Sequence, residues 1–355
     1  MKVLATAMVF FCHSYIVCYE TFNYSIHGFY RIFITPAWGG VWIFLVLGGF
    51  LAAHGFYRGK YNLHMGGVKM YYTNRIVKIL IPTWIFISLA YVLIYQERTP
   101  ALIEMIQYLT CTFNAGSYGL PGIGASWYVF IVMWCYLLAP LIIWILNKLE
   151  VYYQGKELSF YLISFTFVSL LGGLYRVFSF FYLDWYNWTY ANVLGCLDLF
   201  AAGIITYRMI AFLPELSNKR IRLIRIFTNC GLLALILVCI GQGYIPYGIL
   251  LQKYVWPSAY LILTCAILVL YSYKIDENYQ RFPTFWSVCN TIAPYTFTYY
   301  LWHSFMLMYV AAQLKIENDD LHFLLTIVVG AIASSYVAFL MTKMNTGIIK
   351  ALLRL

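Results

Sequence analysis

The sequence predicts an all-α polytopic membrane protein with about ten transmembrane helices and with both chain ends on the inner side. The composition is 63% hydrophobic and 10% charged, whereas soluble domains are about 45–50% apolar and about 25% charged. A water-soluble chain of 355 residues would have to leave much of its Leu, Ile, Phe and Tyr exposed to water. Composition therefore excludes a soluble multidomain protein and indicates that the apolar surface of this protein faces the lipid bilayer. We expect a single transmembrane domain over residues 1–355.

Apolar stretches follow one another along the whole chain. A helix needs about 17–25 apolar residues to cross a hydrocarbon core of about 30 Å. The predicted spans are Val3–Tyr19, Gly40–Tyr57, Ile76–Tyr95, Ser126–Leu146, Leu158–Val177, Ala191–Phe212, Ile226–Gln242, Trp256–Tyr273, Ile292–Ala311 and His322–Met341. The first stretch continues without a small-residue cleavage motif, which favours a retained helix over a signal peptide.

The basic residues predict the orientation of these spans. With the N-terminus inside, the inner segments hold 18 of the 23 Lys and Arg residues. The outer segments hold only Arg31, Arg98, Arg176, Lys253 and Lys315. Positive charge collects on the inner side of membrane proteins, so the N-terminus and the C-terminus are both predicted inside. The net charge of +10 is spread between apolar segments rather than gathered in one patch, and no nucleic-acid partner is expected.

The nine cysteines do not predict a metal site or a disulfide framework. They follow no C-x-x-C spacing, and all but Cys111 lie within or at the edges of apolar stretches. A thiol in that setting behaves as a small hydrophobic group.

Three titratable side chains are predicted to lie deep in the membrane, where ionisable groups are costly and usually functional. At about 1.5 Å per residue, His13 and His303 each lie roughly 16 Å from the inner ends of their spans. Asp198 lies roughly 10 Å from the outer end of its span, close to the same layer. We expect a polar cavity between helices at this depth. The alternative is structural: each histidine bonds a neighbouring carbonyl or hydroxyl across a helix interface, and Asp198 accepts a hydrogen bond from Tyr or Trp.

Five segments resemble, in order, the acyltransferase-3 family of integral membrane O-acyltransferases, which is related to bacterial enzymes that acetylate cell-surface carbohydrates. They are KVLATAMVFFCH (Lys2–His13), GVWIFLVLGGFLAA (Gly40–Ala53), YYTNRIVKILIP (Tyr71–Pro82), SWYVFIVMWCYLLAP (Ser126–Pro140) and YTFTYYLWHSF (Tyr295–Phe305). Lys2 and Lys78 stand where the family usually has arginine. Trp42, Gly48 and Val132 replace residues that are often aspartate, serine and, in one branch, glutamate.

The resemblance implies transfer of an acyl group, usually acetyl, from cytoplasmic acetyl-CoA to a hydroxyl of a glycan or glycolipid at the cell (inner or plasma) membrane. His13 would be the general base, since a neutral imidazole can take the proton of the acceptor hydroxyl. The candidates for contacts to the transition state or acceptor are His303, Tyr299, Trp127 and Asp198. The candidates for holding the phosphates of acyl-CoA are Lys2, Arg58, Arg75 and Lys78.

Two other classes of function remain open from the residues. A proton-coupled transporter or flippase would use His13, His303 and Asp198 as a proton relay. The sequence lacks the inverted-repeat signals and the paired Gly/Pro-broken spans that are typical of such transporters. A receptor is disfavoured because about ten spans do not match a seven-helix plan. The basic blocks 58–78 and 208–225 also have an alternative role as anchors for anionic lipids.

Overall fold

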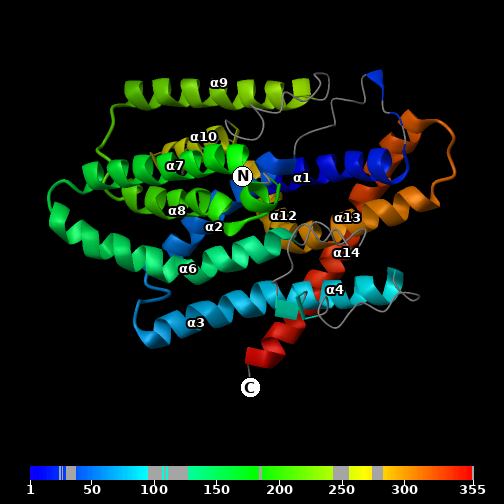
Figure 1. Cartoon of the computed structure of the whole chain (residues 1–355), viewed down its shortest axis with the longest axis horizontal. Coiled ribbons are helices and arrows are strands. Elements are labelled where there is room, and N and C mark those ends of the chain that lie inside the picture. The colour runs from blue at the N-terminus through cyan, green and yellow to red at the C-terminus, as the bar shows by residue number, and fades with distance from the viewer. Residues whose placement is uncertain are drawn as a thin grey trace.

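The computed structural model describes residues 1–23, 25, 27–28, 37–94, 106–107, 109–110, 127–183, 186–242, 256–273 and 283–353. All regular secondary structure in these ranges is helical, which confirms the predicted all-α class. Figure 1 shows most of the helices running roughly side by side, with α14 crossing the others obliquely. The helices are α1 (Lys2–Ile16), α2 (Ala37–Tyr57), α3 (Met65–Arg75), α4 (Ile81–Ile94), α6 (Trp127–Glu150), α7 (Glu157–Tyr182), α8 (Val193–Ile210), α9 (Asn218–Gln242), α10 (Trp256–Tyr273), α12 (Pro283–Ile292), α13 (Thr296–Gln313) and α14 (Asp319–Leu353).

Seven helices within the described ranges are long and apolar enough to cross a membrane, so the chain is a multi-pass membrane protein. They are Lys2–Tyr19, Gly39–Tyr57, Met65–Ala90, Trp127–Tyr153, Glu157–Tyr182, Trp188–Ile210 and Asp319–Ala351. The three other predicted spans coincide with α9, α10 and α13, and α10 contains a shorter apolar helix, Trp256–Leu270. The count of about ten and the inside location of both ends stay predictions from hydropathy and charge.

Helix α2 lies at the centre of the bundle and contacts α1, α6, α8 and α10. Gly49 of α2 lies against the backbone carbonyl of Phe200, and Gly203 of α8 lies against that of Val46. A Cβ atom at either glycine would overlap the facing backbone, so only glycine permits this approach. Close packing through small residues is how helices associate in lipid, where apolar side chains gain little by leaving the solvent.

The third predicted span begins earlier than the hydropathy indicated. Instead of starting at Ile76, the helical run starts with α3 at Met65 and continues through a π-helical turn, Ile76–Leu80, into α4. Hydropathy misses the first turns because they are polar, although Lys, Arg and Met are good helix formers. Arg75 and Lys78 therefore lie within a continuous helical segment and not in a loop.

The ninth predicted span is interrupted near its start. Instead of one helix from Ile292, α12 ends there, a 3₁₀ turn covers Ala293–Tyr295, and α13 begins at Thr296. Pro294 explains the break, because proline lacks an N–H and its ring clashes with the preceding helical turn. The break places Thr296 and Tyr300 on the first turns of a new helix.

Candidate active site

The structure brings His13 of α1 and His303 of α13 into direct contact. Nε2 of His303 lies 3.0 Å from Nδ1 of His13, and the two ring centroids are 4.8 Å apart. His303 is fully buried, whereas His13 keeps some exposure. Two residues separated by 290 positions in the sequence thus form one site.

Backbone carbonyls fix which nitrogen of each ring carries the proton. Nδ1 of His303 lies 2.6 Å from the carbonyl oxygen of Tyr300, and Nδ1 of His13 lies 2.9 Å from that of Val9. A carbonyl oxygen only accepts, so each neutral ring must carry its proton on Nδ1. The Nδ1–H of His13 also points to the unprotonated Nε2 of His303. Nε2 of His13 is left with a lone pair, which is the form a general base requires.

Aromatic rings surround the histidine pair. The ring of Tyr299 is parallel to that of His303 at 6.3 Å, and Phe10 packs on Tyr299 at 5.7 Å. Tyr300 lies 5.6 Å from His303 and contacts Tyr128 of α6 at 5.4 Å. These contacts hold the ring of His303 by packing.

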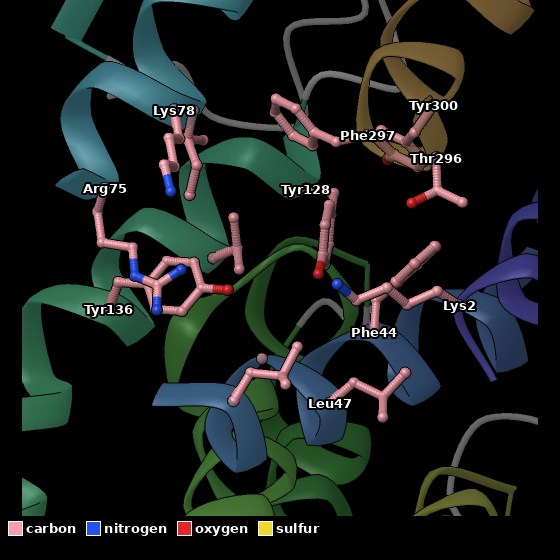
Figure 2. A pocket seen from close by; sticks show the side chains of 14 residues that line it. Lys2, Phe44, Leu47, Arg75, Lys78, Tyr128, Tyr136, Thr296, Phe297 and Tyr300 are labelled. Carbon is pink, nitrogen blue, oxygen red and sulfur yellow. The ribbon is translucent and has the colours of Figure 1, made fainter. Parts of the chain in front are cut away.

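A cavity of about 280 Å³ is lined in part by Tyr300, the residue whose carbonyl accepts from His303. It is lined by Lys2, Phe44, Leu47, Gly48, Leu51, Arg75, Lys78, Ile79, Tyr128, Val132, Tyr136, Thr296, Phe297 and Tyr300. Figure 2 shows three of the predicted phosphate-binding residues around this cavity: Lys2 comes from α1, and Arg75 and Lys78 come from the continuous segment of α3 and the following π-helical turn. We call it the cationic cavity.

Within the described part of the chain, no acidic side chain lines the cationic cavity or pairs with its charges. The ion pairs among the described residues are Arg176–Asp198 and Arg208–Glu150, and neither involves Lys2, Arg75 or Lys78. Arg75 instead lies over the rings of Tyr136 at 4.3 Å and Tyr71 at 5.1 Å, which fixes its plane. The cavity can therefore bind a polyanion without first breaking an ion pair.

Two residues predicted for the site lie elsewhere. Arg58 occupies an exposed turn after α2 and does not line the cationic cavity. Trp127 packs against Tyr190 at 4.5 Å, and the next residue, Tyr128, lines the cavity instead. Neighbouring helical residues point about 100° apart, so one position decides which ring faces the site.

Sequence reasoning missed Tyr128, Tyr136, Thr296 and Tyr300 as cavity residues. A signal was present for the first two, because Tyr128, Val132 and Tyr136 recur at intervals of four residues and share one face of α6. Thr296 and Tyr300 are also four residues apart on α13. The periodicity alone does not show which face of either helix points inward.

Asp198 does not join the histidines in a common polar cavity. Arg176 holds its carboxylate with two hydrogen bonds, of 2.7 Å from Nη2 and 3.1 Å from Nη1. Arg176 was predicted in an outer segment but is 1% exposed inside α7, and it also bonds Ser258 of α10. A Cβ at Gly172 would overlap the Asp198 carboxylate, so this glycine makes room for the pair.

The pairing of Asp198 removes one member of the proposed three-residue proton relay. Asp198 is engaged between α7 and α8, while the histidines lie between α1 and α13. Among the described residues, the three groups that the transporter interpretation requires therefore do not form one proton relay.

Fold and site together define a class: a polytopic membrane protein with a histidine pair between two helices and a cavity lined by three basic residues. The family model described as an acyltransferase domain matches residues 1–343. The chain belongs to the acyltransferase-3 family and is a membrane acyltransferase, as its sequence motifs indicated. No curated protein and no solved structure matches it in the same comparisons.

Four of the five departures from the family pattern fall on the cationic cavity, and Lys2 and Lys78 are two of them. Gly48 and Val132 both line it, whereas Trp42 is buried against Tyr260 at 5.5 Å. A Cβ at Gly48 would lie 3.3 Å from the Phe200 ring and 3.4 Å from the Tyr136 hydroxyl. A serine at this position would therefore narrow the cavity and press on its wall.

Proposed function

We propose that this acyltransferase moves an acyl group, most simply acetyl, from cytoplasmic acyl-CoA to a hydroxyl of a cell-surface or exported glycan or glycolipid. It would act in the cell (inner or plasma) membrane, with His13 as general base. The observation that supports this proposal best is the histidine pair. Its geometry leaves the Nε2 lone pair of His13 available, and the carbonyl of Tyr300, a residue that lines the cationic cavity, accepts from His303.

The cationic cavity supports an acyl-CoA donor. Phosphates form strong charge-assisted hydrogen bonds with Arg and Lys, and the planar fork of Arg75 suits them better than a lysine does. A volume of about 280 Å³ is at the lower end of small-molecule sites. We expect the cavity to hold the thioester arm with its phosphates, and not the whole cofactor.

The proposed reaction has two proton transfers, both through His13. Nε2 of His13 takes the proton of the acceptor hydroxyl while the oxygen attacks the thioester carbonyl carbon. The tetrahedral intermediate then collapses, the C–S bond breaks, and the departing sulfur takes the proton back from the imidazolium. The products are an ester and CoA with a free thiol.

Tyr128 replaces Trp127 as the proposed donor to the oxyanion of this intermediate. Its side chain lines the cationic cavity together with Lys2, Arg75 and Lys78 (Figure 2). His303 is not suited to that role, because its N–H faces the Tyr300 carbonyl. His303 acts as a positioning residue that accepts a hydrogen bond from His13 and fixes its ring. Tyr299 supports His303 by stacking.

Arg75→Ala is expected to raise the KM for acetyl-CoA about 10–100-fold, because it removes a charge-assisted hydrogen bond of about 1.5–3 kcal/mol. The measurement is steady-state transfer with varied acetyl-CoA, together with acetyl-CoA-dependent thermal stabilisation in detergent. Lys69→Ala is the matched control, since Lys69 is an exposed basic residue on the same helix. An effect of Arg75→Ala confined to the acceptor KM would contradict donor binding in this cavity.

His303→Ala is expected to lower kcat about tenfold or more with little change in the KM for acetyl-CoA, because His13 loses the acceptor that orients it. His303→Gln should recover part of kcat, since its amide oxygen can accept the same hydrogen bond. Both variants are measured by the same transfer assay. Equal kcat values for the alanine and glutamine variants would argue against positioning through this hydrogen bond.

A further inference from the structure

A second cavity, of about 570 Å³, lies against α13 and is bounded by α1, α12 and α14. It is lined by Val3, Thr6, Ala7, Phe10, Phe11, Thr291, Ile292, Tyr295, Thr296, Tyr299, Ile327, Val328, Ala331, Ser335, Ala338 and Phe339. We call it the apolar groove. Thr296 lines both this groove and the cationic cavity, so the two spaces adjoin at the first turn of α13.

The lining of the apolar groove is mostly hydrocarbon, and its polar side-chain groups are the hydroxyls of three threonines and of Tyr295, Tyr299 and Ser335. It contains no charged residue. The hydroxyls of Thr6, Thr291 and Thr296 donate to the carbonyls of Lys2, Ser287 and Ala293 within their own helical segments. These threonines therefore present mainly their methyl groups. Phosphate, carboxylate or a bare sugar would lose its hydration here without replacement, whereas a hydrocarbon chain would not.

The shape of the groove matches an extended chain that enters from the lipid. Its α1 side runs from Val3 to Phe11, about 12 Å, and its α14 side runs from Ile327 to Phe339, about 18 Å. Ile292, Val328 and Phe339 of this lining are 43%, 47% and 39% exposed. Exposed apolar side chains on membrane-spanning helices face lipid, so the groove is accessible from the bilayer.

The groove is lined by two neighbours of the histidine pair. Phe10 and Tyr299 line it, and Tyr299 stacks directly on His303. His13 follows Phe10 by three residues on the same helix, which places both on neighbouring faces of α1. A chain in the groove would thus carry its head group to the proposed base, while the cationic cavity brings the donor from the other side of Thr296.

We propose that the apolar groove binds the hydrocarbon chain of the acceptor, and that the acceptor is therefore a membrane-embedded glycolipid and not a soluble glycan. This inference rests on the proposed function and specifies its substrate class. The donor is assigned to the cationic cavity by its charge, which leaves the groove to the second substrate.

Surrogate acceptors of different chain length test this assignment. Purified protein would receive labelled acetyl-CoA and methyl, octyl or dodecyl β-glucoside, each below its critical micelle concentration. We expect kcat/KM to rise at least about tenfold from methyl to dodecyl, since each buried methylene favours binding.

Ala331→Trp should fill the groove and remove this dependence of kcat/KM on chain length. Ile332→Trp adds the same ring at the next position, which is 67% exposed outside the groove, and should preserve it. Equal kcat/KM for methyl and dodecyl glucoside in the unmodified protein would overturn the proposal.

Photolabelling separates the possible occupants without requiring turnover. A dodecyl glucoside that carries a diazirine on its chain should label residues 3–11 and 327–339, and Ala331→Trp should lower this labelling at least about fivefold. Displacement of the probe by long-chain acyl-CoA, but not by dodecyl glucoside, would reassign the groove to the donor chain and overturn the proposal. Equal labelling by a diazirine phosphatidylcholine that excess dodecyl glucoside does not displace would make it an ordinary lipid site and also overturn it. Specific labelling without transfer to any glucoside would support the groove as a glycolipid site and count against the proposed reaction.

Discussion

His13→Ala is expected to lower turnover about 10²–10⁴-fold, the usual contribution of a general base. The hydrogen bonds from His13 Nδ1 to Val9 and His303 leave Nε2 as the proton acceptor. Alanine supplies no replacement at a buried position. The measurement is transfer of labelled acetyl from acetyl-CoA by purified protein. The KM for acetyl-CoA should change little, because His13 does not line the cationic cavity.

A second histidine provides the control for this experiment. His54 lies exposed on α2, where it packs on the ring of Tyr207 at 5.6 Å. His54→Ala should keep turnover within about twofold of the unmodified protein, as expected for an exposed side chain outside the site. Thermal unfolding of both variants in detergent would show that each is folded. Undiminished turnover of folded His13→Ala would exclude the general-base role.

Asp198→Ala is expected to destabilise the protein by about 3–5 kcal/mol, because it leaves the Arg176 guanidinium charged and buried without its partner. The pair is 1% and 5% exposed, and it joins α7 to α8. Chemical or thermal unfolding in detergent micelles measures the loss. The double variant Arg176→Met with Asp198→Leu should recover most of the stability, since apolar groups of similar size often replace a buried pair at little cost.

The pair between Arg208 and Glu150 is the matched control. Its side chains are 27% and 16% exposed, so solvent screens the charge that remains when one partner is removed. Glu150→Ala should therefore destabilise the protein less than Asp198→Ala. A stable Asp198→Asn variant that has lost all activity would instead point to a functional proton on Asp198, as the relay interpretation requires.

The sequence was sufficient to predict the class of the protein and the common layer of two of its candidate site residues, His13 and His303. Composition and the length of the apolar stretches can be read from the sequence alone, and they predicted an all-α membrane protein. Helical rise placed His13 and His303 at one depth, and the structure shows them 3.0 Å apart. The motifs around them indicated the family that the comparison then showed.

Helix boundaries were less predictable from hydropathy. The third predicted span was wrong at its start because polar residues such as Asn74 and Arg75 continue the helix outside the apolar stretch. The ninth was wrong at its start because Pro294 breaks the backbone within an apolar run. In both cases the apolar stretch and the helical backbone begin at different residues.

The sequence by itself determined that this is a helical membrane protein, because that follows from the composition and the length of the apolar stretches. A fixed rise per residue also predicted that His13 and His303 share one layer. Only the tertiary structure decided which groups meet. Depth does not specify rotation about a helix axis or the choice of neighbouring helix. For that reason Asp198, predicted beside the histidines, is paired with Arg176. Tyr128, one position from the predicted Trp127, lines the cationic cavity. The apolar groove forms only where α1, α13 and α14 come together, so no single segment of the sequence predicts it.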